Sequence, residues 1–132
     1  MKLLREDQII ARVIPYLSKN GWIITSQKTH SEHGVDIIAK KGYGRFIYIE
    51  CKGDTKSGPQ RDAYFVYALG QITTRMSRSK WQHYGLAFPR SFYPKLKRLP
   101  WLFAKRNNVF VLLIDEKSID KYTWKEFKKL QK

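Results

Sequence analysis

The sequence has one cysteine in 132 residues. A single thiol cannot form an internal disulfide, and it excludes a zinc site built from several cysteines. Long apolar stretches are missing as well, because no run approaches the roughly 20 residues that cross a bilayer. The first seven residues, MKLLRED, contain no apolar core of a secretion signal. We therefore expect no membrane partner and a cytoplasmic location, in association with the nucleoid.

Acidic residues are also scarce. Aspartate and glutamate total 11 against 26 lysines and arginines, which gives a formal net charge of +15 at pH 7. Solubility of a small domain needs a net charge of only about 2–8, and a larger excess attracts polyanions in a salt-dependent way. The charge therefore favours nucleic acid as the partner over an anionic membrane surface or an acidic protein.

Hydrophobic residues make up 42% of the chain and aromatic residues 14%, which is enough for a core in one domain. Their spacing predicts a helix, three strands, and then alternating helices and strands, at residues 6–17, 22–25, 34–41, 45–52, 60–78, 84–88, 91–106, 109–114 and 118–132. The predicted fold class is α/β, with one mixed central sheet flanked by helices. All 132 residues form a single domain, with a core at 6–88 and a helix–strand–helix extension at 91–132.

The second and third predicted strands form a hairpin around a short loop with two glycines. If Lys41 pairs with Arg45 across this loop, Asp36 lies directly opposite Glu50, with Cβ atoms only ~5 Å apart. Lys52 falls on the same face because it lies two residues beyond Glu50. The opposite face of the hairpin is expected to be apolar, with Val35, Ile37, Ala39, Ile47, Ile49 and Cys51.

Two carboxylates in direct opposition destabilise a sheet unless something offsets their repulsion. A divalent cation does so, and oxygen ligands with several retained waters suit Mg²⁺. Such a metal polarises a phosphoryl oxygen, lowers the pKa of a bound water and stabilises the leaving oxygen. Lys52 is then placed to hold the attacking water or to neutralise charge at the phosphorus. In the alternative interpretation, these are ordinary charges on a half-exposed sheet, and Lys52 only offsets the acids.

Asp36, followed after thirteen residues by Glu50-Cys51-Lys52, resembles the Asp…(Asp/Glu)-x-Lys motif of the PD-(D/E)xK nuclease superfamily. This group includes type II restriction endonucleases, Mrr-like enzymes and archaeal Holliday junction resolvases. The segments HGVDIIAKK and FIYIECKG are similar to its motif strands, and the predicted order of elements over 6–88 is similar to its core. One departure is Val35, which stands where the motif has proline.

The resemblance implies a restriction endonuclease-like fold and Mg²⁺-dependent hydrolysis of phosphodiester bonds, with Mn²⁺ able to replace Mg²⁺. Asp36 and Glu50 would bind the metal together with the main-chain carbonyl of Cys51, and Lys52 would be the catalytic lysine. DNA is the expected substrate, ahead of RNA.

Glu6 and Gln71 are two further candidates for the site. Glu6 extends the apolar stripe of the first predicted helix, where a carboxylate is costly unless it is paired or binds a metal. Several members of the superfamily have a metal-binding acid on this helix. Gln71 matches a glutamine that Mrr-like and resolvase-like members have facing the catalytic centre. The alternatives are a first-turn glutamate stabilised by the helix dipole and a glutamine on a solvated helix face.

Cations suited to contact phosphates flank the hairpin loop and surround the helix predicted at 60–78, at Lys40, Lys41, Arg45, Lys56, Arg61, Arg75, Arg78 and Lys80. Such contacts position a nucleic-acid backbone without reading its sequence. His30 and His33 have no third suitable ligand nearby, so we interpret them as plain polar residues. We expect packing roles for the four tryptophans, although an exposed one can stack on an unpaired base.

The sequence therefore predicts an endonuclease that cuts DNA. The chain has no obvious target-recognition domain, which favours branched or junction DNA with little sequence selectivity, and a role in DNA repair or recombination. A resolvase would act as a homodimer, with C-terminal aromatic residues as a candidate interface. Competing interpretations are a non-catalytic nucleic-acid-binding module, an RNA-processing nuclease, and a subunit of a larger transposition or repair complex.

Overall fold

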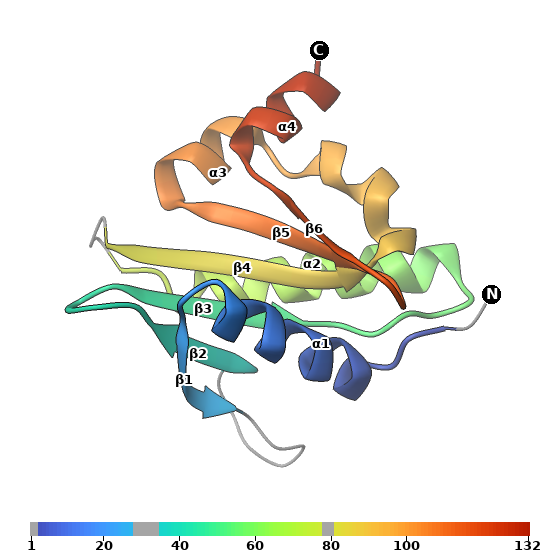
Figure 1. Ribbon diagram of the computed structural model, residues 1–132. Coiled ribbons are helices and arrows are strands. Elements are labelled where there is room, and N and C mark those ends of the chain that lie inside the picture. The colour runs from blue at the N-terminus through green and yellow to red at the C-terminus, as the bar shows by residue number, and fades with distance from the viewer. Residues whose placement is uncertain (1–2, 28–34, 78–80) are drawn as a thin grey trace.

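A six-stranded open sheet forms the centre of the protein (Figure 1). The computed structural model describes residues 3–27, 35–77 and 81–132. Within them the strands lie side by side in chain order: β1 (Ile23–Gln27), β2 (Ile37–Lys40), β3 (Phe46–Cys51), β4 (Gln82–Pro89), β5 (Val109–Ile114) and β6 (Ile119–Tyr122). β3, β4 and β5 run parallel, and the other neighbouring pairs are antiparallel. The predicted fold class, α/β with a mixed sheet, is confirmed.

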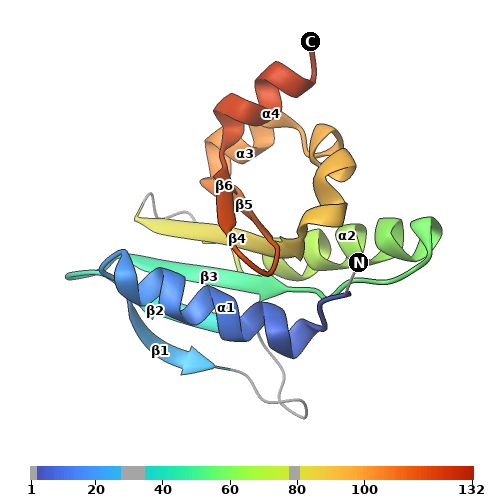
Figure 2. The same cartoon turned by 45° about the vertical axis from the view of Figure 1, so that its right-hand side comes forward.

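Helices cover both faces of the sheet (Figure 1 and Figure 2). They are α1 (Glu6–Lys19), α2 (Gly58–Thr73), the 3₁₀ helix η1 (Arg90–Arg98), α3 (Trp101–Asn107) and α4 (Trp124–Leu130). α1 packs on one face through Ile9, Val13 and Leu17, which recur at helical spacing and are almost fully buried. The other four helices enclose a second core, in which Phe65, Phe88, Phe92 and Phe127 pack together.

The β2–β3 hairpin has the register that its loop predicts. Ile37 pairs with Ile49 and Ala39 with Ile47, and the Lys41 N–H donates to the Arg45 carbonyl at 3.0 Å. Gly42 and Gly44 have φ angles of +66° and +76°, a region that glycine enters without steric cost. This register places Asp36 opposite Glu50, one position beyond the end of the ladder.

One member of the predicted apolar face lies elsewhere. Ile37, Ala39, Ile49 and Cys51 pack under α1 as expected, but Val35 belongs to the core on the opposite face. The chain bends at Asp36, before β2 begins, so the alternation of a regular strand does not extend back to Val35. The prediction for Val35 was therefore wrong.

The C-terminal half departs from the predicted order of elements. The helical stretch at 91–106, predicted with interruptions at Pro94 and Pro100, forms η1 and α3, with Leu99 and Pro100 between them. The break at Pro100 is confirmed, since proline lacks the N–H that a continuous helix needs, whereas Pro94 lies inside η1. Residues 118–132 form the edge strand β6 followed by α4. The helix predicted at 60–78 runs from Gly58 to Thr73. The structure thus contains one strand that the periodicity did not reveal.

The C-terminal aromatic residues mostly serve the core. Phe127 is fully buried, and Trp124 packs against Trp101 with ring centroids 6.0 Å apart. The C-terminal segment therefore exposes less aromatic surface than the prediction of a homodimer interface there assumed. Among the helices in the described residues, none has the length and apolar character needed to cross a bilayer.

Candidate functional site

Asp36 and Glu50 lie inside the protein, each with about 1% of its surface exposed. The Asp36 Oδ2 accepts a hydrogen bond of 2.7 Å from the Cys51 N–H, which ties the start of β2 to the residue after Glu50. Burial of a charged carboxylate is costly unless other groups compensate for the lost water. Two such groups in neighbouring positions therefore need positive charge or hydrogen-bond donors close by.

Lys52 provides one positive charge at this end of β3. Its N–H donates to the Ala87 carbonyl at 3.0 Å, so the backbone still follows β4. Its Nζ lies 3.9 Å from the Glu6 Oε1 and 4.7 Å from the centre of the Tyr67 ring. The side chain is 18% exposed. The ammonium thus lies at the edge of the site, between the start of α1 and the exposed face of α2.

Acidic side chains gather near Cys51 in a strongly basic protein. Burial raises the pKa of the Cys51 thiol well above its ordinary range, and the charges of Asp36, Glu50 and Glu6 raise it further, while Lys52 lowers it. These four charged groups therefore surround one short main-chain segment. Acidic side chains thus outnumber the lysine around this segment, and carboxylate oxygens are ligands that suit a hard cation.

Gly53 brings the start of α1 to the end of β3. A Cβ on Gly53 would lie 2.5 Å from the Glu6 backbone N and 2.9 Å from the Arg5 backbone C. The Asp54 N–H also donates to the Leu4 carbonyl at 2.7 Å, and Figure 1 shows the N-terminal segment meeting the loop that follows β3. Sequence reasoning missed this contact, although an isolated glycine after the motif lysine is a signal for close backbone approach.

The residues present fit a hard cation with few protein ligands. No three His, Cys, Asp or Glu side chains converge on a metal position within residues 3–27, 35–77 and 81–132. Mg²⁺ binds well through one or two carboxylates while it keeps several waters, and Asp36 and Glu50 offer such a pair. Glu6 lies in the first turn of α1 and beside Lys52. The helix dipole and the ion pair with Lys52 both stabilise its carboxylate. Its role as a metal ligand stays a prediction.

The exposed face of α2 contributes Tyr67 and, one turn later, Gln71. Residues four apart lie next to each other on a helix surface. The Gln71 Oε1 is buried and accepts no hydrogen bond from the described part of the chain. An amide oxygen in this state has an acceptor available for a water or a ligand, which is compatible with the predicted place of Gln71 in the site.

The cations predicted to contact DNA have different surroundings. Lys40, Lys56 and Arg75 are exposed, as phosphate contacts require. Arg61 donates to the buried carboxylate of Asp54 at 3.2 Å, so it also holds the start of α2 to the loop after β3. Lys41 and Arg45 line a groove at the far end of the hairpin. The remaining two, Arg78 and Lys80, lie outside the described residues, as do His30 and His33, which were interpreted as plain polar residues.

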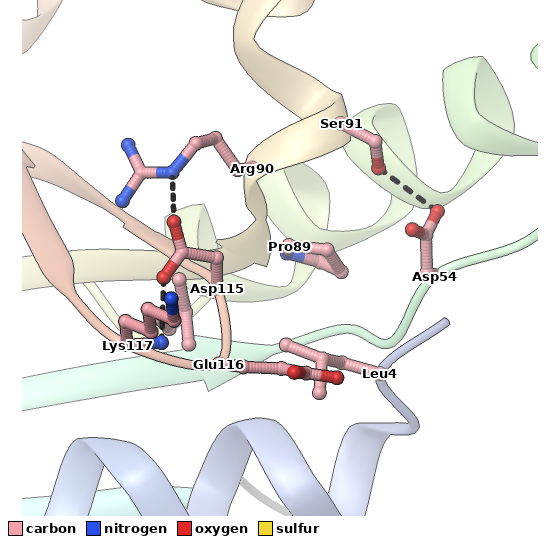
Figure 3. A pocket seen from close by; sticks show the side chains of 9 residues that line it. Leu4, Asp54, Pro89, Arg90, Ser91, Asp115, Glu116 and Lys117 are labelled. Carbon is pink, nitrogen blue, oxygen red and sulfur yellow. Dashed lines mark hydrogen bonds and ion pairs between the residues drawn. The ribbon is translucent and has the colours of Figure 1, made fainter. Parts of the chain in front are cut away.

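A cavity of about 540 Å³ adjoins this site at the carboxyl ends of β4 and β5 (Figure 3). Two of its lining residues, Arg90 and Asp115, form an ion pair at 2.8 Å, and Arg90 also contacts Asp120 at 2.6 Å. The N–H groups of Lys117 and Ser118, and then Arg90, lower the pKa of the Asp115 carboxyl to about 2. The network ties the β5–β6 turn to the end of β4, and its charges are already satisfied. The carboxylate centre is therefore the better candidate for chemistry.

No protein-family model matches the chain, and no curated protein sequence matches it either. The chain is similar to the crystal structure of an XisH family protein from Nostoc punctiforme, with a TM-score of 0.56 and 26% sequence identity, over 87% of this chain and 98% of the other. The crystal structure of an FdxN element excision controlling factor protein from Anabaena variabilis aligns over the same shares at 24% identity and a TM-score of 0.47. The XisH family structure supports the mixed α/β fold described above.

Proposed function

We propose that the protein is a metal-dependent endonuclease that hydrolyses phosphodiester bonds in DNA. One observation carries the proposal: in a chain with net charge +15, the two most deeply buried acids of the described residues, Asp36 and Glu50, lie opposite each other across the β2–β3 hairpin, and Lys52 follows at the end of β3. A protein that only binds nucleic acid gains nothing from acids at this place, because they repel phosphates. The arrangement also supports the resemblance of Asp36, Glu50 and Lys52 to the PD-(D/E)xK motif.

The residues of the chain divide the work between them. Asp36 and Glu50 would hold the cation, with the Cys51 carbonyl beside them. Mg²⁺, when bound, polarises the phosphate and acidifies a coordinated water. Lys52 lies at the edge of the site with its ammonium partly exposed, where it can meet the negative charge that develops on a phosphate during attack. The Gln71 amide oxygen can orient a water from the α2 side.

The test is a cleavage panel with the full chain. Labelled linear duplex, single strand, flap and four-way junction DNA, and a structured RNA, are incubated with Mg²⁺, with Mn²⁺ and with EDTA. We expect cutting of DNA with either metal, none with EDTA, and a preference for branched DNA over linear DNA and RNA. Salt-sensitive binding without cutting under any metal would overturn the proposal and leave a binding module.

Tyr67 gives a prediction about the position of Lys52. An ammonium over an exposed aromatic ring gains about 0.5–1 kcal/mol, and Tyr67 is 61% exposed. We expect Tyr67→Ala to lower the kcat of DNA cleavage by about two- to fivefold with an unchanged KM, because the ring orients Lys52 and does not bind DNA strongly. Tyr67→Phe, which keeps the ring, should retain the wild-type rate.

The neighbouring Val66 provides a control for Tyr67, because it is also exposed, at 55%. Val66→Ala should leave cleavage unchanged. A Tyr67→Phe protein as slow as Tyr67→Ala would assign the effect to the hydroxyl group and contradict the contact of the ring with Lys52.

A further inference from the structure

A second concave surface lies at the opposite end of the sheet. It is a groove of about 510 Å³ between the end of α1, the loop end of the β2–β3 hairpin, the start of β5 and the start of α4. The hairpin tip marks this end on the left of Figure 1. The groove is therefore separate from the cavity of Figure 3, which adjoins the carboxyl ends of β4 and β5.

The groove combines cations with aromatic rings. Lys41, Arg45, Lys121 and Lys125 line it, and no acidic side chain is among the described residues that do so. The Lys41 Nζ lies 5.5 Å from the centre of the Trp22 ring. The cations thus lie beside aromatic surface rather than apart from it.

Further contacts place positive charge on both sides of the groove. The Lys125 Nζ lies 6.0 Å from the Trp124 ring centre, and the Lys121 Nζ lies 4.9 Å from the Phe110 ring centre. Burial, and then the charges of Lys121 and Arg45, lower the pKa of the His83 imidazole in the same groove. Burial is the larger cause, and the two cations add to it because both lie near the imidazole.

We infer that this groove binds an unpaired strand of nucleic acid, with a base against the tryptophan rings and phosphates on the surrounding cations. Single strands are held by positively charged grooves with aromatic side chains on which bases stack. The bases of a duplex are stacked on each other and cannot lie on a side chain unless they flip out. A groove that served duplex phosphates alone would need the cations but not the rings.

The groove is distinct from the proposed catalytic centre. Arg45 and Glu50 are five residues apart in an extended segment, which separates them by about 17 Å. Ile47, which lines the groove, faces α1, whereas Glu50 has the opposite orientation in the alternation of the strand. The inference does not need the cleavage reaction, so it can be tested by binding in the absence of a metal.

The experiment measures binding of a fluorescent single strand of about 20 thymidines, in EDTA, by anisotropy. Arg45, Lys121 and Lys125 are exposed, so Arg45→Ala/Lys121→Ala/Lys125→Ala removes three charges from the groove with little effect on folding. We expect this variant to bind the single strand about tenfold more weakly than the wild type, with a much smaller loss for a duplex of the same length.

The matched control removes three exposed charges outside the groove, as Lys97→Ala/Lys129→Ala/Lys132→Ala. This control variant should lose at most about a third of the wild-type affinity for the single strand, and the salt dependence of its binding should change little. Trp22→Leu should lower the affinity for the single strand several-fold and leave the affinity for the duplex unchanged. Thermal melting checks that this variant is folded. Equal losses in the two triple variants, or equal losses for single strand and duplex, would overturn the inference in favour of a general attraction for polyanions.

Discussion

Asp36→Asn is expected to abolish metal-dependent cleavage, with a rate at least about 10²–10³-fold below that of the wild type. An amide oxygen is a much poorer ligand for Mg²⁺ than a carboxylate, because it lacks the negative charge. The substitution is nearly isosteric, and the asparagine Oδ1 can still accept the hydrogen bond that the Cys51 N–H donates to Asp36. The measurement is single-turnover cleavage of the best substrate from the panel, at several Mg²⁺ concentrations.

Stability should change in the opposite direction. Asp36 and Glu50 are both buried and lie opposite each other across the hairpin. Removal of one charge relieves repulsion between buried carboxylates, so without metal the variant should melt at or above the wild-type temperature. Loss of activity with unchanged or higher stability separates a chemical role for Asp36 from a structural one.

Asp62→Asn is the control for this substitution. Asp62 pairs with Lys95 at 2.5 Å and Arg98 at 2.9 Å, in a link between α2 and η1 away from the carboxylate centre. The Asp62→Asn protein should cleave DNA at the wild-type rate. Full activity of Asp36→Asn, or an equal loss in both variants, would contradict the assignment of the site.

Gly53→Ala should reduce both stability and cleavage. The added Cβ would lie 2.5–3.1 Å from backbone atoms of Arg5 and Glu6. These atoms cannot avoid the clash by a change of rotamer, as a side chain can. Overpacking of this kind costs about 1–3 kcal/mol in the free energy of unfolding. It should also move the start of α1 away from Lys52, and a displacement of about 1 Å in a site can slow a reaction by up to ~100-fold.

Two measurements separate these effects of Gly53→Ala. Urea unfolding gives the loss of stability, and cleavage is measured at a temperature where wild type and variant are both fully folded. Gly70→Ala is the matched control, because its Cβ would meet nothing within 4 Å and alanine favours α2 by up to ~1 kcal/mol. A Gly53→Ala protein with wild-type stability and rate would show that the close approach of α1 is not required.

The β2–β3 hairpin could be predicted well because its information is local. Two glycines determine the loop, the loop determines the register, and strand alternation places Glu50 and Lys52 on one face. β5 was predicted at its observed bounds, because a continuous apolar run is typical of a strand that is buried on both faces. The fold class followed from the order of such segments.

β6 could not be predicted in the same way. Its four residues, IDKY, are mostly polar, and the lysines and aromatic rings around them also fit an amphipathic helix. The strand exists because it pairs with β5, as Leu112 with Lys121 and Leu113 with Asp120. Charged residues are common on such edge strands, and they remove the apolar periodicity that identifies a strand in a sequence.

The sequence by itself determined the acids, the lysine and their common face, because neighbours across a hairpin follow from spacing along one short segment. Only the tertiary structure decided that Glu6 contacts Lys52, that the backbone at the start of α1 packs directly against Gly53, and that Asp36 and Glu50 are both buried. It also decided that cations from the hairpin and from β6 and α4 form one groove with tryptophan rings. These contacts join segments far apart in the chain, and their geometry depends on how whole helices pack on the sheet rather than on any local pattern.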